Sequence, residues 1–232
     1  MKKILFLFIS FFLFTGILVF ADSRFSPVSI GLGLFTDFTP QKDTDEWSVN
    51  PGGMIAMRGY FKQLNEKFNL GIAFSFGTPF SSVSNINWKM PDGDEFNFNK
   101  DFASMFEFDF AFGGSLLGEI NKSLFYLVDL SFLFNMTIAS RKLGYYLMYG
   151  NVEQNFNITD YGVSIKPGLM FTFGKFSFEI SAHLKFYFLR MYSYKLYSDY
   201  NETMLDEYKY NTSENALQFR IQPYILAGFY LP

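Results

Sequence analysis

The sequence predicts an all-β protein, a single eight-stranded antiparallel up-and-down transmembrane β-barrel. Three observations indicate this: apolar and polar residues alternate along long segments, eight such segments occur, and their connections alternate between long and short. Successive side chains of a strand point to opposite faces of a sheet. Each segment would therefore have one apolar face and one small or polar face, as in a barrel with a lipid-facing exterior and a polar lumen.

The clearest pair of segments runs from Tyr161 to Leu189, with Gly174-Lys175 at the turn. Apolar side chains occupy every second position of both arms, from Val163 to Phe173 and from Phe176 onwards. Each arm is about twice the length of an ordinary globular strand. Its apolar face is too large to be covered in a thin two-sheet sandwich, so this hairpin favours a membrane-spanning wall.

The same alternation recurs along the chain. We expect strands at Val28–Leu34, Gly53–Lys62, Phe68–Gly77, Phe102–Phe112, Leu124–Met136, Tyr161–Phe173, Phe176–Leu189 and Leu217–Phe229. We expect long polar loops at about Asp37–Pro51, Pro79–Asp101, Ile138–Asn155 and Arg190–Asn215, alternating with three tight turns. In outer-membrane barrels the short turns are periplasmic and the long loops extracellular, which predicts periplasmic termini. The alternative is a soluble sandwich or lipocalin-like barrel, whose apolar face points inward and whose strands are shorter.

Two prolines fall inside the expected strands. Pro167 and Pro223 each remove one donor from the hydrogen-bond ladder. β-Bulges at these two points would absorb them.

Residues 1–21 have the pattern of a cleaved signal peptide, which leaves residues 22–232 as the barrel domain. Lys2-Lys3 form a basic start, Ile4–Phe20 an apolar stretch, and Val19-Phe20-Ala21 a small-residue cleavage site. An uncleaved membrane anchor is the alternative for this stretch. Export is what a barrel in an outer membrane requires, so we expect the mature chain to begin near Asp22.

Composition supports a membrane-facing surface and excludes several functions. Aromatic residues make up 22% of the 232 residues, with 33 Phe, 15 Tyr and 2 Trp, as suits a lipid-facing wall with interfacial girdles. The absence of Cys excludes disulfides, thiolate metal sites and cysteine nucleophiles. A formal net charge of −3 gives no footprint for nucleic acid.

The chain resembles the small eight-stranded outer-membrane barrels of Gram-negative-type bacteria, the OmpX, OmpW and OmpA-barrel group. The resemblance covers about Phe25–Pro232 and depends on the architecture and on the closing segment Gln222–Leu231. That segment is similar to the alternating aromatic C-terminal signal that the barrel-assembly machinery recognises, although the chain ends on Leu231-Pro232 instead of Phe. The resemblance implies an outer-membrane location in a diderm bacterium, contact with outer-membrane lipids, and insertion through the C-terminal strand.

The inward faces of the expected strands carry nine ionisable residues, which are the candidate site. They are Arg58, Glu107, Asp109, Asp129, Lys166, Glu179, His183, Lys185 and Arg220. Counted from the short turns, Arg58, Asp129, Lys166 and His183 should share one height near mid-membrane, with Glu107 and Arg220 higher and Glu179 lower. An eight-stranded barrel is just wide enough for side chains to fill it. We expect an ion-pair network that plugs the lumen; the alternative is a polar constriction or gated path for a small solute.

Other chemistry is poorly supported by the sequence. Glu179, Ser181 and His183 share a face, but residues two apart on a strand are roughly 6–7 Å apart, too far for a Ser–His hydrogen bond. A single His makes a His-based metal site improbable. The acidic turn Asp92–Glu95 has oxygen ligands of the kind Ca²⁺ takes, although such turns are usually only solvated.

We therefore expect a non-enzymatic barrel without a cofactor, with a structural role in the envelope, minor small-solute passage, or both. The alternative is a surface adhesin or ligand-binding protein that engages host or environmental ligands through its four long loops. The Tyr-rich fourth loop, from Tyr192 to Tyr210, would be such an adhesive surface or else a strand extension above the membrane.

Overall fold

The computed structural model describes residues 27–40, 47–65, 67–80, 87–89, 95–97, 104–146, 150–198, 203–212 and 217–231. The regular structure in these residues is β-strand, arranged in one large sheet and one two-stranded sheet. Within these ranges, no helix is long and apolar enough to cross a membrane. The expected signal peptide at residues 1–21 lies outside the described residues.

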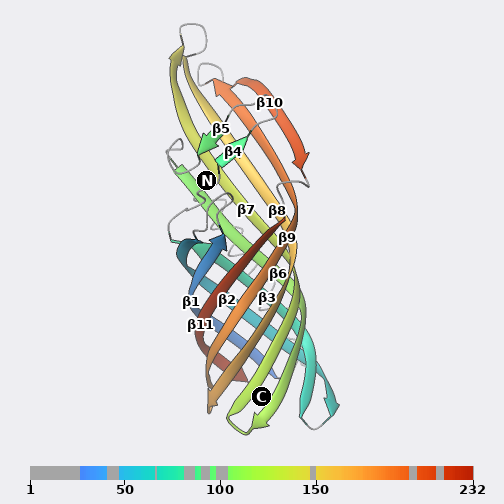
Figure 1. The fold of residues 1–232 in the computed structure, drawn as a ribbon. Coiled ribbons are helices and arrows are strands. Elements are labelled where there is room, and N and C mark those ends of the chain that lie inside the picture. The colour runs from blue at the N-terminus through green and yellow to red at the C-terminus, as the bar shows by residue number, and fades with distance from the viewer. Residues whose placement is uncertain are drawn as a thin grey trace.

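The large sheet closes into a ring of eight antiparallel strands (Figure 1). In order around the ring these are β9 (Phe176–Ser198), β11 (Gln218–Leu231), β1 (Val28–Pro40), β2 (Trp47–Asn65), β3 (Phe68–Pro79), β6 (Ser104–Asn121), β7 (Leu124–Tyr146) and β8 (Gly150–Phe173). β8 pairs with β9 and so closes the ring. The predicted eight-stranded antiparallel up-and-down barrel is confirmed.

Two separate strands pair with the same edge of β9. β10 (Thr203–Thr212) pairs with the second half of β9, where Thr212 lies opposite Arg190. β11 pairs with the first half of β9, where Gln218 lies opposite Tyr187. Both run in the same direction along β9. Most of the segment predicted as a loop at Arg190–Asn215 is therefore β-strand, which agrees with the alternative of a strand extension.

The barrel has a short-turn end and a tall end. The turn predicted at Gly174-Lys175 is confirmed between β8 and β9, and Gly174 has the positive φ of 63° that glycine tolerates best. Val28 at the start of β1 pairs with Leu231 at the end of β11, so both described ends of the chain lie at the short-turn end. At the other end β7, β8, β9 and β10 rise above the remaining strands (Figure 1).

These rising strands replace other predicted loops. β7 runs to Tyr146 and β8 begins at Gly150, so the loop predicted at Ile138–Asn155 was also wrong. The predicted first loop is shortened in the same way, because β1 extends to Pro40 and β2 begins at Trp47. The second loop contains a small hairpin of β4 (Asn87–Lys89) and β5 (Glu95–Asn97).

The polarity of the outward face explains why the sequence missed these extensions. On β8 the outward side chains are apolar at Val163 and Tyr161 but polar at Asn157, Asn155 and Glu153. The inward side chains change in the opposite sense, and the apolar Ile158, Phe156 and Val152 are buried on that face. A strand above the lipid needs no apolar exterior, so the pattern that predicted strands ends where the membrane-facing band ends.

The length of this band fits a bilayer. The outward apolar residues of β8 extend from Tyr161 to Phe173, which is 12 residue steps (173 − 161). At about 3.3 Å per residue and a strand tilt of about 40°, the band is roughly 30 Å tall, close to the ~25 Å apolar band of outer-membrane barrels.

The tilt follows from the register. Successive partners around the ring are Val28, Gly59, Ile72, Gly114, Leu130, Ile165, Leu184, Ile221 and then Phe38. One circuit therefore returns to β1 ten residues beyond its start (38 − 28 = 10). Ten residues of stagger over eight strands require a tilt of about 40°. Residues that are hydrogen-bonded neighbours consequently differ in height by about 3 Å per strand.

The two prolines are accommodated without the expected bulges. The β8–β9 register is the same before and after Pro167, at Ile165↔Leu184 and Gly168↔Ser181, but no pairing joins the two residues between. The Pro167 carbonyl accepts a hydrogen bond from the Ser181 hydroxyl at 2.6 Å. The β11–β1 ladder is interrupted in the same way at Pro223, also with no shift. The barrel therefore opens its ladder locally instead of inserting a residue.

Candidate functional site

A lower ion-pair cluster crosses the lumen near the short-turn end. The Arg58 guanidinium on β2 donates to both Asp129 oxygens on β7 at 3.1 and 3.0 Å. It also donates to both Glu179 oxygens on β9 at 2.8 and 2.9 Å. All three residues are buried. Two neutral donors complete the cluster: the Ser115 hydroxyl bonds Asp129 at 2.6 Å, and the Tyr224 hydroxyl bonds Glu179 at 2.6 Å.

An upper ion-pair cluster lies closer to the tall end. The Lys185 ammonium on β9 lies between Asp109 on β6 and Asp37 on β1; it bonds both carboxylates, and its nitrogen is 3.2 Å from Asp37 Oδ2. Arg220 on β11 donates to Glu107 at 2.8 Å. Three further contacts tie these groups together: Asn135 Nδ2 donates to Glu107 and Asp109 at 2.8 Å each, and the Tyr187 hydroxyl donates to Asp109 at 2.8 Å.

A third ion pair lies beyond the upper cluster. Arg190 on β9 donates through Nε and Nη2 to the two Asp160 oxygens on β8, at 2.5 and 2.7 Å. Both residues are buried. Sequence reasoning missed this pair because the expected strand arms stopped at Tyr161 and Leu189.

Between the two clusters, Lys166 and His183 have only uncharged hydrogen-bond partners. Lys166 Nζ donates to the Ser75 hydroxyl on the opposite wall at 2.6 Å. His183 Nδ1 lies 3.3 Å from Gln222 Oε1. Both side chains are nearly inaccessible to solvent, with exposed fractions of 1% and 2%.

All nine candidate residues point into the lumen and are buried. The structure brings seven of them into three groups: Arg58 with Asp129 and Glu179, Asp109 with Lys185, and Glu107 with Arg220. Glu179 was expected lower in the lumen, but its carboxylate meets the Arg58 guanidinium directly. Lys166 lies opposite Asp129 in the β7–β8 register, and His183 makes no hydrogen bond to Arg58 or Asp129. Strand tilt is the reason, since equal distances from the turns do not give equal heights in a staggered barrel.

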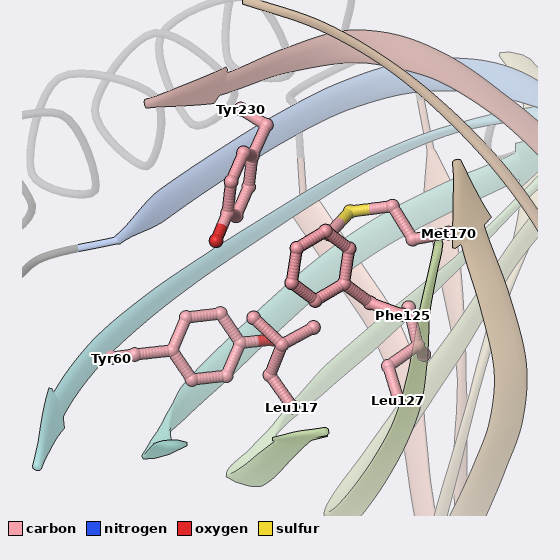
Figure 2. Packing of buried hydrophobic residues seen from close by; sticks show 6 residues of the cluster. All are labelled: Tyr60, Leu117, Phe125, Leu127, Met170 and Tyr230. Carbon is pink, nitrogen blue, oxygen red and sulfur yellow. The ribbon is translucent and has the colours of Figure 1, made fainter. Parts of the chain in front are cut away.

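The short-turn end of the lumen is closed by apolar side chains. Figure 2 shows six of them converging from five strands, and we call them the apolar plug: Tyr60, Leu117, Phe125, Leu127, Met170 and Tyr230. The Phe125 and Tyr230 rings lie 5.4 Å apart between centroids. Leu117 and Leu127 have exposed fractions of 0% and 1%. The inward positions near the short turns are thus a small hydrophobic core.

The lumen offers little for catalysis. The Ser181 hydroxyl donates to the Pro167 carbonyl, and His183 Nδ1 contacts Gln222, so neither residue activates the other. Among the described residues no group of three or more His, Cys, Asp or Glu side chains is placed to hold a metal ion. The acidic turn Asp92–Glu95 lies outside the described residues except for the backbone of Glu95 in β5. What the geometry provides is a set of paired, desolvated charges.

The closed eight-stranded ring, with its apolar exterior and charged interior, is the fold of an outer-membrane β-barrel. No protein-family model and no curated protein matches the sequence. A major outer membrane protein from Thermus thermophilus is 10% identical, with 88% of this chain and 99% of that chain covered and a TM-score of 0.51. That likeness shows a shared fold, as the sequence-based resemblance predicted.

Two further solved structures are more distantly alike. Ail, the attachment invasion locus protein of Yersinia pestis, is 11% identical, with 88% of this chain and 98% of that chain covered and a TM-score of 0.47. The outer membrane protease OmpT of Escherichia coli is 10% identical, with 88% and 95% covered and a TM-score of 0.33. A shared fold does not define a function, so the role of this chain must be argued from its own residues.

Proposed function

We propose that this chain is a non-conducting, non-enzymatic barrel of the outer membrane of a diderm bacterium, with a structural role in the envelope. The observation that carries the proposal is the filled lumen. The apolar plug closes the short-turn end, and the lower and upper ion-pair clusters cross the lumen above it. An eight-stranded barrel has no room for a wide channel beside such side chains.

The energetics of the charged clusters favour a permanent closure. Buried charges are tolerated when they are paired and hydrogen-bonded, and removing one partner typically costs about 3–5 kcal/mol. Arg58 makes two hydrogen bonds to each of its carboxylates, and Lys185 bonds two. Opening a path for solutes would require these contacts to be broken in both clusters. Passage of small solutes is therefore the less favoured role.

Orientation and insertion belong to the same proposal. The tall end would face outward and the short turns the periplasm, in keeping with other outer-membrane barrels. The exposed Phe173, Phe176 and Phe229 near the short turns would lie against membrane lipid. β11 would carry the signal for the barrel-assembly machinery, since it contains the alternating aromatic segment Gln222–Leu231 and closes the ring on β1.

Planar-bilayer recording of the refolded, full-length protein tests the closed lumen. We expect no unitary current steps under conditions in which a wide porin, prepared in the same detergent, gives stable channels. Reproducible steps of defined size from the unmodified chain would overturn the proposal. Heat-modifiable gel mobility of the same sample must first show that the barrel is folded.

A second candidate function is favoured by the tall end. β7, β8 and β9 have 23, 24 and 23 residues, whereas a strand needs about 9–11 residues to cross a bilayer. Roughly half of each strand would therefore stand outside the membrane as a sheet with a polar outer face. Such a surface suits an adhesin or ligand-binding protein.

Adhesion of bacteria that display the protein to cultured epithelial monolayers tests this second candidate. The matched variant replaces the outward Glu153, Asn155 and Asn157 together with alanine, which leaves the buried inward face unchanged. Adhesion above that of the empty strain, lost in the variant at equal surface level, would favour the surface role. Adhesion no higher than that of the empty strain would contradict it for this cell type.

A further inference from the structure

Five polar side chains form a contiguous patch on the inner wall halfway along the lumen. We call Ser131, Ser164, Lys166, His183 and Gln222 the mid-lumen cluster. Ser131 on β7 lies directly opposite Ser164 on β8, and His183 on β9 lies opposite Gln222 on β11. Lys166 shares the inner face of β8 with Ser164, and the unshifted β8–β9 register places it opposite His183.

Four polar atoms of this cluster have no hydrogen-bond partner within the protein. They are Ser131 Oγ, Ser164 Oγ, His183 Nε2 and Gln222 Nε2. Their side chains are buried, with exposed fractions between 2% and 6%. A buried polar atom without a partner costs about 1–3 kcal/mol, and native proteins rarely leave several together. A bound species would satisfy these four atoms.

Charge indicates which species that would be. Lys166 has the Ser75 hydroxyl as its hydrogen-bond partner and forms no ion pair. Asp129 still attracts Lys166 through space, but both oxygens of that carboxylate are held by Arg58. Glu179 attracts Lys166 as well, and both oxygens of that carboxylate are likewise held by Arg58. The cluster therefore holds one cation without an ion-pair partner, together with unused hydrogen-bond donors.

We propose that the mid-lumen cluster binds one small monovalent anion, such as chloride. Lys166 Nζ supplies the charge and spare N–H donors, Gln222 Nε2 supplies an amide donor, and the two serine hydroxyls turn toward the ion. A cation is disfavoured by the ammonium group. A larger or multiply charged anion is disfavoured because Arg58, Lys185 and the side chains around them already fill the lumen on both sides.

This site goes beyond the proposed structural role and does not depend on conduction. The apolar plug closes the short-turn end and the upper ion-pair cluster crosses the lumen on the tall side. The ion would therefore be captured as the barrel folds, so the tests use protein refolded in the named salt. A bound ion of this kind would stabilise the folded barrel by RT ln(1 + L/Kd), where L is the free anion concentration, so the stability should rise with that concentration. Unitary currents would refute the closed lumen, and an empty mid-lumen cluster would refute the anion site. The two results are independent of each other.

Crystals of the full-length protein grown in sodium bromide test the site directly. We expect an anomalous difference peak within about 3.5 Å of Lys166 Nζ and beside the Ser131–Ser164 pair. A cluster occupied only by ordered water, with no anomalous signal at saturating bromide, would overturn the proposal.

Thermal unfolding gives a second readout in solution. The folded barrel in detergent should unfold a few degrees higher in sodium chloride than in sodium gluconate of equal ionic strength. Lys166→Met should abolish this difference. The double variant S131A/S164A should reduce it, and it serves as the test if Lys166→Met does not fold.

The matched control is Lys175→Met, which removes a lysine from the exposed turn between β8 and β9. It should keep the full chloride effect. A chloride effect that persists in Lys166→Met and in S131A/S164A, or is absent in the unmodified protein, would contradict the site.

Discussion

Arg58 of β2 and Glu179 of β9 form a doubly hydrogen-bonded ion pair across the lumen, although 121 residues separate them in the chain. Neither residue is near the other in the unrolled sheet. Strand tilt and closure of the ring bring them to one height, and the same geometry places Asp129 on the other side of the guanidinium. This contact shows how the barrel turns dispersed charges into a compact network.

Replacement of Arg58 by Met should destabilise the barrel strongly. It would leave Asp129 and Glu179 buried without their cation, at a cost of about 3–5 kcal/mol. Urea unfolding in lipid vesicles, followed by gel mobility, measures this loss. The triple variant R58M/D129N/E179Q removes the unpaired charges as well, so it should recover much of the stability. Equal stability of Arg58→Met and the unmodified protein would contradict the role of the pair.

Gly113 and Gly114 provide a matched test of how closely β6 approaches β7. A Cβ at Gly113 would lie 1.9 Å from the Leu130 carbonyl oxygen, whereas a Cβ at Gly114 would meet nothing within 4 Å. Gly113→Ala should therefore push β6 from β7 and destabilise the fold, while Gly114→Ala should be neutral or stabilising by up to about 1 kcal/mol. Unfolding midpoints of the two variants, measured side by side, decide this. Indistinguishable midpoints would argue against the tight approach.

Pro167 and Pro223 should mark weak points in the hydrogen-bond ladder. Pro223 pairs with Ala182 on β9, and the unshifted β8–β9 register places Pro167 opposite the same residue. Hydrogen exchange should be faster at the amide of Ala182 than at that of Ile180, whose β8 partner Leu169 lies beyond the interruption.

Pro167→Val should slow exchange at the Ala182 amide, because it restores an N–H donor without changing the register. Pro27→Val is the control, since the Pro27 carbonyl accepts a hydrogen bond from Tyr60 on β2 and the residue does not pair with β9. It should leave exchange at β9 unchanged. Uniform protection along β9 in the unmodified protein would refute this prediction.

The change of polarity along β8 predicts where the membrane ends. The natural chain has no Cys, so single cysteines can be introduced without a background. The Asn155→Cys variant should react with a charged, membrane-impermeant maleimide in liposomes, and the Val163→Cys variant should not. Both positions face outward on the same strand, so only their height differs. Equal labelling would place the boundary elsewhere.

The alternation of apolar residues by itself determined the fold class and the membrane-facing band. Outward Phe176, Phe178 and Ile180 on β9 repeat with the two-residue period of a strand, and a lipid-facing wall is the structure that this period permits over such lengths. The same two-residue period predicted which side chains point into the lumen, and all nine candidate residues do so. These properties are local, since they depend only on neighbouring positions along the chain.

The extent of the strands was decided by the tertiary structure. Above Tyr161 the outward face is polar, and the inward face carries the apolar Ile158, Phe156 and Val152 among polar residues. The membrane pattern therefore disappears although β8 continues to Gly150. Pairing with β7 and β9 holds this part of the strand. No local signal separates such a strand from a polar loop.

The pairing of the lumen charges was likewise decided only by closure. The partners Asp37, Asn135 and Tyr187 could not be predicted, because their heights depend on the ten-residue stagger around the ring. That stagger is a property of all eight strands together. The sequence by itself determined which face each charge occupies, and the closed barrel decided which charge it meets.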